Sequence, residues 1–340
     1  MSKLYGAIDL HSNNNYSGII NEKDEWVAKK RLDNNLKIID AFFRPYKDRL
    51  TAIAVESTYN GYWLVDGLMD KRYNIKLANP SQMDTFKGLK YQDDKTDTRW
   101  LATMIRLGIL PESYIYPREI RPLRDLLRKR MLLMGKRTGI LSSLNNQFAT
   151  WLNRKIPRSE LYFLTAEELE EMFKEQNLYQ AARSLLNIVK AIEKEIKTIE
   201  AGAYQQMKDN ATTKRLMDLP GIHKLLAMTI DLETGARGRF KRDKNYISYC
   251  GLVESKRISS GKKKGEANRK SRNATLRWAY GEAAAHAVRC YEKIKRYKKR
   301  LQKRKKHATA MAIIASKIAR IAYKTMKDEK FVYKEELLFN

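Results

Sequence analysis

The order of strands and helices in the first hundred residues is the feature that most restricts the fold. Apolar runs at residues 5–10, 16–20 and 26–31 have the length of strands, and turn residues at 21–24 join the second run to the third. Helical spacing of apolar residues follows at 36–46 and again at about 62–70. Two further strand-like runs, at 51–55 and 74–78, alternate with these helices. A mixed sheet with helices on its faces is therefore expected.

This succession, β-β-β-α-β-α-β with a further helix at about 95–107, is that of an RNase H-like α/β domain. We place this domain at residues 1–117.

Four acidic residues fall where such a fold would bring them together. Asp9 ends the first strand and Glu56 ends the fourth, and these two strands are neighbours in an RNase H-like sheet. Asp94 and Asp97 are three residues apart at the start of the following helix, and therefore share one helix face. Asp93 is a close rival to Asp94, which we prefer because the three-residue offset requires it.

Each acid alone is more often a turn residue or a helix cap than a ligand. Converging together, however, four carboxylates are hard oxygen donors that suit Mg²⁺, the expected cofactor. The sequence therefore predicts a metal-dependent phosphodiester site formed by Asp9, Glu56, Asp94 and Asp97.

A helical region occupies residues 118–210. An Arg-rich helix is expected from about 118 to 151, and a capping box, Thr165 to Glu168, opens another. Apolar residues then follow alternating spacings of four and three, which predicts a coiled coil: Leu178, Ala182, Leu185, Val189, Ile192, Ile196, Ile199 and Ala203. This stripe fits either a seam with a second chain, which we favour, or an internal hairpin with the Arg-rich helix.

Residues 211–340 return to globular composition and predict a mainly α C-terminal domain. A Lys- and Arg-rich run at 293–306 precedes an Ala-rich helix at about 308–326.

The charge of the chain points to a polyanionic partner. Sixty-eight Lys and Arg against 39 Asp and Glu leave a formal net charge of +29, which attracts nucleic acid and makes binding sensitive to salt. Without a long apolar run or a lipidation signal, we expect no membrane partner.

With two distant cysteines, Cys250 and Cys290, we expect a reducing cytoplasm. With nucleic acid as the partner, we expect the protein to be associated with the nucleoid. The four histidines, His11 included, lack metal-ligand spacing and are interpreted as structural or incidental.

The motifs resemble those of a known family. Residues 6–11, 54–58 and 94–102 are similar to the DEDD transposases of the "IS one-ten" insertion-sequence family. In the C-terminal half, the resemblance is carried by Leu219-Pro220-Gly221-Ile222, Arg239-Phe240, the segment 249–253, Ser259-Ser260-Gly261 and Leu276-Arg277.

The resemblance implies a recombinase with a RuvC-like domain, a coiled-coil linker and a helical domain that carries a nucleophilic serine. It implies Ser260 as that nucleophile, with Ser259 as the rival. The implied partners are a structured bridge-type guide RNA, donor DNA, target DNA and further copies of the chain, as a dimer or an active tetramer.

The chain departs from the family pattern in three places. Lys262-Lys263-Lys264 stand where a second glycine is usual, Arg272 replaces another glycine, and Asp231 is interpreted as standing for the usual glutamate after the Pro-Gly helix.

Basic residues crowd around Ser260 and along the start of the Arg-rich helix, which suits a nucleic-acid backbone. The predicted contacts are Arg118, Arg121, Arg124, Arg128, Lys256, Arg257, Lys262, Lys263, Lys264, Arg269, Arg272 and Arg277.

Two alternatives stay open: a RuvC-like nuclease or junction resolvase that hydrolyses DNA with water, and a non-catalytic RNA-binding protein. The first predicts an inert Ser260, and the second predicts RNA binding without a metal requirement.

Overall fold

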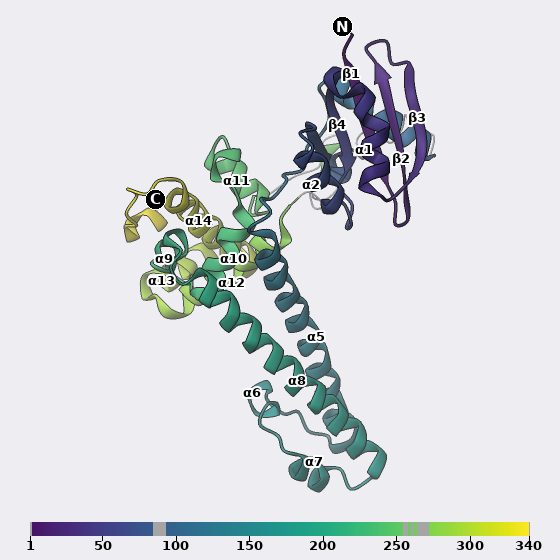
Figure 1. Ribbon diagram of the computed structural model, residues 1–340. Coiled ribbons are helices and arrows are strands. Elements are labelled where there is room, and N and C mark those ends of the chain that lie inside the picture. Colours follow the sequence, from purple (N-terminus) through teal and green to yellow (C-terminus); the bar gives the residue numbers. More distant parts are fainter. Residues whose placement is uncertain (1, 84–92, 254–257, 260–261, 264–271, 340) are drawn as a thin grey trace. The chain divides into compact units, whose positions relative to one another are not determined.

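The computed structural model describes residues 2–83, 93–253, 258–259, 262–263 and 272–339 (Figure 1). It divides into two units, Met1–Ile115 and Tyr116–Asn340, and each is described by itself. None of the helices in the described part of the chain combines the length and the hydropathy that a membrane-spanning segment requires.

The first unit is built on a five-stranded mixed sheet of order β3-β2-β1-β4-β5. The strands are β1 (Leu4–Leu10), β2 (Asn14–Asn21), β3 (Trp26–Asp33), β4 (Leu50–Glu56) and β5 (Ile75–Ala78). β1, β2 and β3 form an antiparallel meander, whereas β1, β4 and β5 run parallel. All five predicted strands are present, and the sheet confirms an RNase H-like fold.

Helices cover both faces of this sheet. α1 (Leu36–Phe43) and α2 (Tyr62–Asp70) pack on one face, where their apolar residues join large side chains such as Ile8 and Val55. α4 (Asp94–Arg106) packs on the other face, against the small residues Ala7 and Ala54. Ala7 and Ala54 therefore mark the face next to α4, and their small side chains let this helix approach the sheet closely.

Two further short helices lie among the described residues of this unit. Residues predicted to extend the first helix instead form the 3₁₀ helix η1 (Arg44–Arg49), because Pro45 cannot donate the backbone hydrogen bond that an α-helix needs. α3 (Pro80–Met83) follows β5.

A long helical hairpin opens the second unit. α5 (Arg121–Leu152) and α8 (Gln176–Met207) pack along each other, and α6 (Arg158–Leu161) and α7 (Ala166–Met172) lie at the hairpin end (Figure 1). The predicted capping box of Thr165 and Glu168 is present.

The apolar stripe of α8 faces inward in this hairpin. Ala182, Val189, Ile196 and Ala203 are all buried. α5 is the main helix that packs against α8, and the short helices at the hairpin end and α10 add contacts near its two ends. Ion pairs from Arg130 to Glu200 and from Arg137 to Glu193 also join the two helices. The internal hairpin is therefore the alternative that the structure adopts, and the seam with a second chain, which we favoured, is wrong for these buried positions. A four-and-three spacing records that one face is apolar, not which helix covers it.

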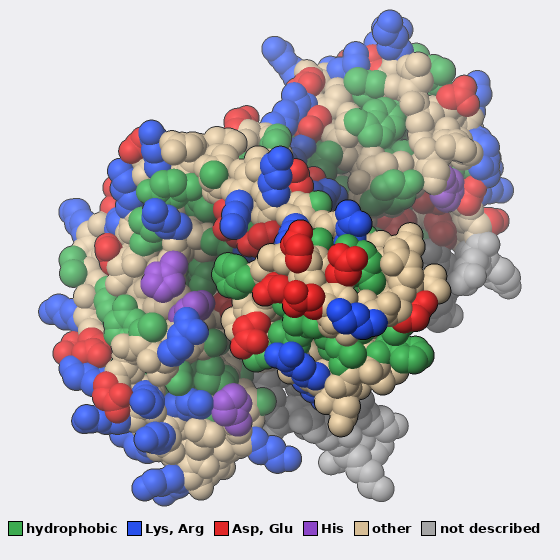
Figure 2. All heavy atoms as spheres, turned by 90° about the horizontal axis from the view of Figure 1, so that it is seen from below, with side chains coloured by type: hydrophobic (Ala, Val, Ile, Leu, Met, Phe, Trp, Pro, Cys, Tyr) green, Lys and Arg blue, Asp and Glu red, His purple; other side chains and the backbone are tan. Residues whose placement is uncertain are grey.

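The hairpin end differs from the rest of the chain in charge. Figure 2 looks onto this end and shows acidic side chains grouped there; α7 exposes Glu167, Glu168, Glu170 and Glu171.

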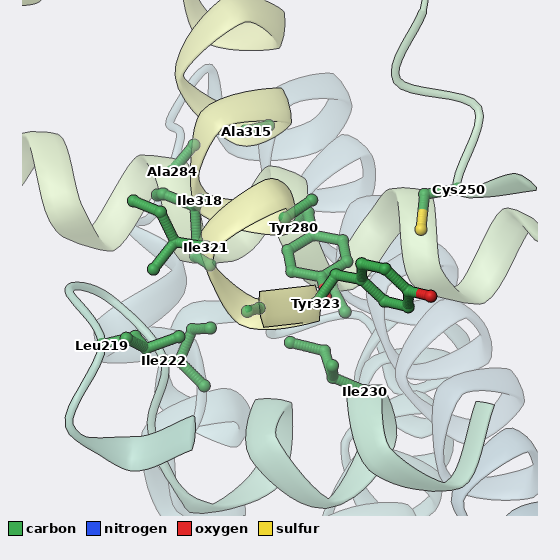
Figure 3. Packing of buried hydrophobic residues seen from close by; sticks show 14 of the residues in the cluster. Leu219, Ile222, Ile230, Cys250, Tyr280, Ala284, Ala315, Ile318, Ile321 and Tyr323 are labelled. Atoms are coloured by element: carbon green, nitrogen blue, oxygen red, sulfur yellow. The ribbon is translucent and has the colours of Figure 1, made fainter. Parts of the chain in front are cut away.

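The rest of the second unit is a helical bundle. Its elements are α9 (Ala211–Met217), α10 (Lys224–Thr234), η3 (Arg237–Arg239), α11 (Asp243–Tyr249), the short strands β6 (Ile258–Ser259) and β7 (Lys262–Lys263), α12 (Ala274–Cys290), α13 (Glu292–Gln302), α14 (His307–Lys327) and η4 (Glu335–Leu338). Figure 3 shows its core, where Tyr280 of α12 and Tyr323 of α14 lie among aliphatic residues from several helices.

The Pro-Gly motif has a packing role in this bundle. Gly221 has φ of +77°, and a Cβ there would lie 2.0 Å from the Ala283 backbone oxygen of α12. Only glycine fits both the conformation and the contact.

Candidate active site

β1 and β4 carry Asp9 and Glu56 to the same end of the sheet. The two strands are parallel neighbours, with Ile8 level with Val55, so the residues that follow, Asp9 and Glu56, are also level. Side chains alternate along a strand. Asp9 therefore shares the face of Ala7, and Glu56 that of Ala54, which is the face that α4 covers.

The N-terminus of α4 brings Asp94 and Asp97 to this face. Asp93 is the N-cap residue and its carboxylate accepts a hydrogen bond from the Thr96 backbone N–H. Thr98 fixes the helix on the sheet by donating a 3.1 Å hydrogen bond to the Tyr16 backbone oxygen. Asp93 is thus occupied in capping the helix, whereas Asp94 is held toward the strand ends.

His11 belongs to this group, which corrects its interpretation as an incidental histidine. Its Nε2 atom lies 3.2 Å from Asp94 Oδ1 and 3.5 Å from Asp9 Oδ2. The sequence signal for the position of His11 is strand alternation, because a residue two positions after Asp9 tends to lie on the same side of the sheet as Asp9. The His11 backbone oxygen accepts hydrogen bonds from Asn34 Nδ2 at 2.9 Å and Asn60 Nδ2 at 3.1 Å, which hold this turn.

The donors are not equally close to one another. One ligand atom each from Asp9, His11 and Asp94 lie within 4.8 Å of one another, the one such group among the described residues. Glu56 and Asp97 lie outside this close group, although both are near enough to act electrostatically on Asp9.

The pKa of Asp9 reflects the charges and the burial at this site. Burial raises its pKa to about 6; the charge of His11 opposes that rise, while the negative charges of Glu56, Asp97 and Asp94 add to it. Asp9 is only 5% exposed. The charge of His11 therefore does not offset the burial of Asp9 and the repulsion from the three other carboxylates.

The residues present fit a divalent cation. Carboxylate oxygens are the donors that Mg²⁺ and Ca²⁺ prefer, and imidazole adds a donor that transition metals accept. The Nε2 atom of His11 is buried and lies 3.2 Å from Asp94 Oδ1, but it forms no well-oriented hydrogen bond with any group in the described part of the chain. Arg31 of β3 already forms an ion pair with Asp94, so one cationic group occupies part of the site and is itself held by Asn14 Oδ1 at 2.9 Å.

Ser260 lies outside the described residues, as does Gly261. The flanking strands β6 and β7 pair antiparallel, with Ser259 opposite Lys262. The assignment of Ser260 as nucleophile rather than Ser259 stays a prediction.

The predicted nucleic-acid contacts fall into several classes. Arg118 and Arg277 are exposed, and Arg272 is half-buried. Arg121 donates a hydrogen bond to the Tyr116 backbone oxygen, and Arg124 and Arg128 form ion pairs with the buried carboxylate of Glu233. Only the backbone of Lys262 and Lys263 is described, and the remaining predicted contacts lie outside the described residues: Lys256, Arg257, Lys264 and Arg269.

Glu233 is a buried acid that was not predicted from the sequence. Asp231, the residue interpreted as standing for the usual glutamate, is buried and pairs with Arg237. Glu233, two residues later on α10, is 2% exposed and contacts Arg124, Arg128 and Asn273.

Comparison with known families assigns both halves of the chain. Residues 7–157 match the DEDD transposase family of IS110 type, and residues 213–299 match the family described as "Transposase IS116/IS110/IS902 family". A search of curated proteins gives no match. Both matches name the same kind of enzyme and follow each other along the chain, and their families imply DNA substrates and use of a divalent metal. This chain therefore belongs to the IS110 family of DEDD transposases.

Proposed function

We propose that this transposase is an RNA-guided DNA recombinase that uses Mg²⁺ and forms a covalent phosphoserine intermediate through Ser260. Its site residues are the acids Asp9, Glu56, Asp94 and Asp97, with His11 beside them. Its proposed partners are a bridge-type guide RNA, donor DNA, target DNA and further copies of the chain.

The observation that carries the proposal is the convergence of carboxylates at the ends of β1 and β4 and the start of α4. Burial first, and then the charges of the neighbouring acids, raise the pKa of Asp9, and a bound cation would offset both effects. The second family match spans the segment that contains Ser260, which supports a role for that segment in transposition.

When bound, a divalent cation would polarise a phosphate and stabilise negative charge as it develops. The Ser260 hydroxyl would attack the DNA phosphorus, so that a new Oγ–P bond replaces one P–O bond of the backbone. The serine gives up its proton, and the released deoxyribose oxygen takes one up. The number of phosphoester bonds is unchanged, so the strand can be rejoined without an external energy source.

A trapped DNA adduct tests this proposal. A DNA substrate that is cut but cannot be religated should leave protein attached to one DNA end after denaturation. Ser260→Ala should remove the adduct and all recombination, because alanine has no oxygen that can attack. Its RNA and DNA affinity should hardly change, since a single neutral hydroxyl contributes only about 1 kcal/mol.

Ser259→Ala is the matched control, because it removes the neighbouring hydroxyl and should retain the adduct. Normal cutting by Ser260→Ala with Mg²⁺ would instead establish the hydrolytic nuclease. RNA binding without any metal-dependent cutting, in the wild-type protein, would establish the non-catalytic alternative.

A further inference from the structure

Glu233 is a buried charge surrounded by cationic and polar groups of the same unit. Its carboxylate accepts hydrogen bonds from Arg128 Nη2 at 2.9 Å and from Asn273 Nδ2 at 2.8 Å, and Arg124 Nη2 lies 3.0 Å away. Burial alone would raise the pKa of Glu233, but the bond from Arg128 and the charges of Arg124 and Arg128 outweigh it and lower that pKa. Glu233 is therefore a fixed anion.

Asn273 links this anion to α12, the helix that follows the segment 252–271, which contains Ser260 and is called the serine segment. Its Oδ1 accepts the Leu276 backbone N–H at 3.0 Å and so caps α12. Its Nδ2 donates to Glu233 and also to Tyr249 Oη at 3.2 Å. One buried amide thus caps a helix and binds two partners at the same time.

The same contacts hold the two ends of the serine segment together. The Asn273 backbone N–H donates a 2.8 Å hydrogen bond to the Tyr249 backbone oxygen, and Arg277 Nη1 donates to the Gly251 oxygen at 3.1 Å. Gly251 has φ of +67°, and a Cβ there would lie 2.6 Å from Arg272 Cδ. Residues 249–251 and 272–277 therefore meet closely, and Ser260 lies between them in sequence.

Tyr249 is fixed from its other side as well. Its hydroxyl is 2.8 Å from the hydroxyl of Tyr116, which donates to the Glu233 backbone oxygen at 2.8 Å. The Arg239 guanidinium lies 4.4 Å from the centre of the Tyr249 ring. Arg239 and Tyr249 both belong to motifs on which the family resemblance rests, so the network accounts for motif residues that contribute no acid or nucleophile.

We propose that Asn273, held by Glu233, is a positioning residue that sets the placement of the serine segment for attack on DNA. This inference rests on the proposed function of Ser260. Misplacement of a reacting group by about 1 Å is enough to slow a reaction by roughly a hundredfold.

Asn273→Ser tests the inference, because serine caps a helix about as well as asparagine but has no amide to donate to Glu233 and Tyr249. The full-length protein, with guide RNA and saturating DNA, should form the trapped adduct roughly 10- to 100-fold more slowly. Its DNA affinity should stay within about twofold, since the change adds and removes no charge. Asn273→Asp, which keeps the cap but places a carboxylate against Glu233, should be slower still.

The matched control is Asn210→Ser. Asn210 caps α9 with a 2.8 Å bond from the Thr213 N–H and is exposed. The Asn210→Ser variant should form the adduct at the wild-type rate. Its melting temperature should fall by no more than that of Asn273→Ser.

The outcomes separate the inference from the function on which it rests. If wild-type protein forms the adduct and Asn273→Ser forms it at the same rate, the positioning role is overturned while the serine mechanism stands. A fall in rate that only follows a fall in folded fraction or DNA affinity also overturns it. If wild-type protein cuts DNA and forms no adduct, the proposed function fails, and the inference fails with it.

Discussion

Asp9 and Glu233 are both buried carboxylates, and their surroundings shift their pKa values in opposite directions. Asp9 has other acids around it, and burial with their charge raises its pKa to about 6. Glu233 is just as buried, yet two arginines and an amide lower its pKa. Asp9 has one imidazole, that of His11, at 3.5 Å to set against three neighbouring acids, whereas Glu233 is paired with two arginines. A buried acid that the protein leaves unsatisfied is a candidate ligand, and one that the protein satisfies is a structural anchor.

The largest effect should come from removing the unsatisfied carboxylate. Asp9→Asn should lower the rate of strand cleavage by roughly a thousandfold, because a metal-held phosphate accounts for several kcal/mol of transition-state stabilisation. Nucleic-acid binding, measured by filter retention or fluorescence anisotropy, should stay largely intact.

Asp93→Asn is the control for this experiment, since asparagine caps a helix as well as aspartate does and Asp93 faces solvent. Its cleavage rate should match that of the wild-type protein. Equal rates for Asp9→Asn and the wild type would remove Asp9 from the site.

The satisfied carboxylate should matter most for stability. Glu233→Gln leaves Arg124 and Arg128 without their anion, and breaking a buried ion pair costs about 3 kcal/mol or more. Urea unfolding should show this loss as a lower midpoint with an unchanged slope.

Asp209→Asn provides the comparison, because the pair of Asp209 with Lys214 is largely exposed. It should cost less than about 1 kcal/mol. Equal losses in the two variants would mean that the Glu233 network contributes no more than a surface pair.

Much of the first unit was predictable because its signals are local. Five short apolar runs gave five strands, and the known strand order of an RNase H-like sheet placed Asp9 beside Glu56. His11 was missed because a lone histidine has no metal-ligand spacing, and the strand alternation that places it on the side of Asp9 does not reveal that Asp94 lies there too. Its role emerges only when α4 brings Asp94 to within 3.2 Å of its ring.

The second unit shows why other features were not predictable. Glu233 meets Arg128 across 105 positions of sequence, and an acid within an apolar helix gives no indication of so distant a partner. The stripe on α8 was correctly recognised as apolar. The helix that covers it, α5, is separated from α8 in sequence by a region that contains two short helices. Local patterns identify which residues need a partner, while the fold determines which partner they find.

Thermal unfolding of metal-free protein, with and without added Mg²⁺, tests the proposed cation site most directly. The folded-state pKa of Asp9 is raised from 3.8 to about 6, so its ionisation opposes folding. Stability should therefore fall as pH rises from about 4 to about 6, relative to Asp9→Asn, and stay low above that range.

Near neutral pH, Mg²⁺ should raise the melting temperature of the wild-type protein. At a concentration a hundred times the dissociation constant, the gain would be about 2.7 kcal/mol. Asp9→Asn should gain little or nothing. If Mg²⁺ stabilises both proteins equally, or neither, the carboxylates at the ends of β1 and β4 do not form a cation site.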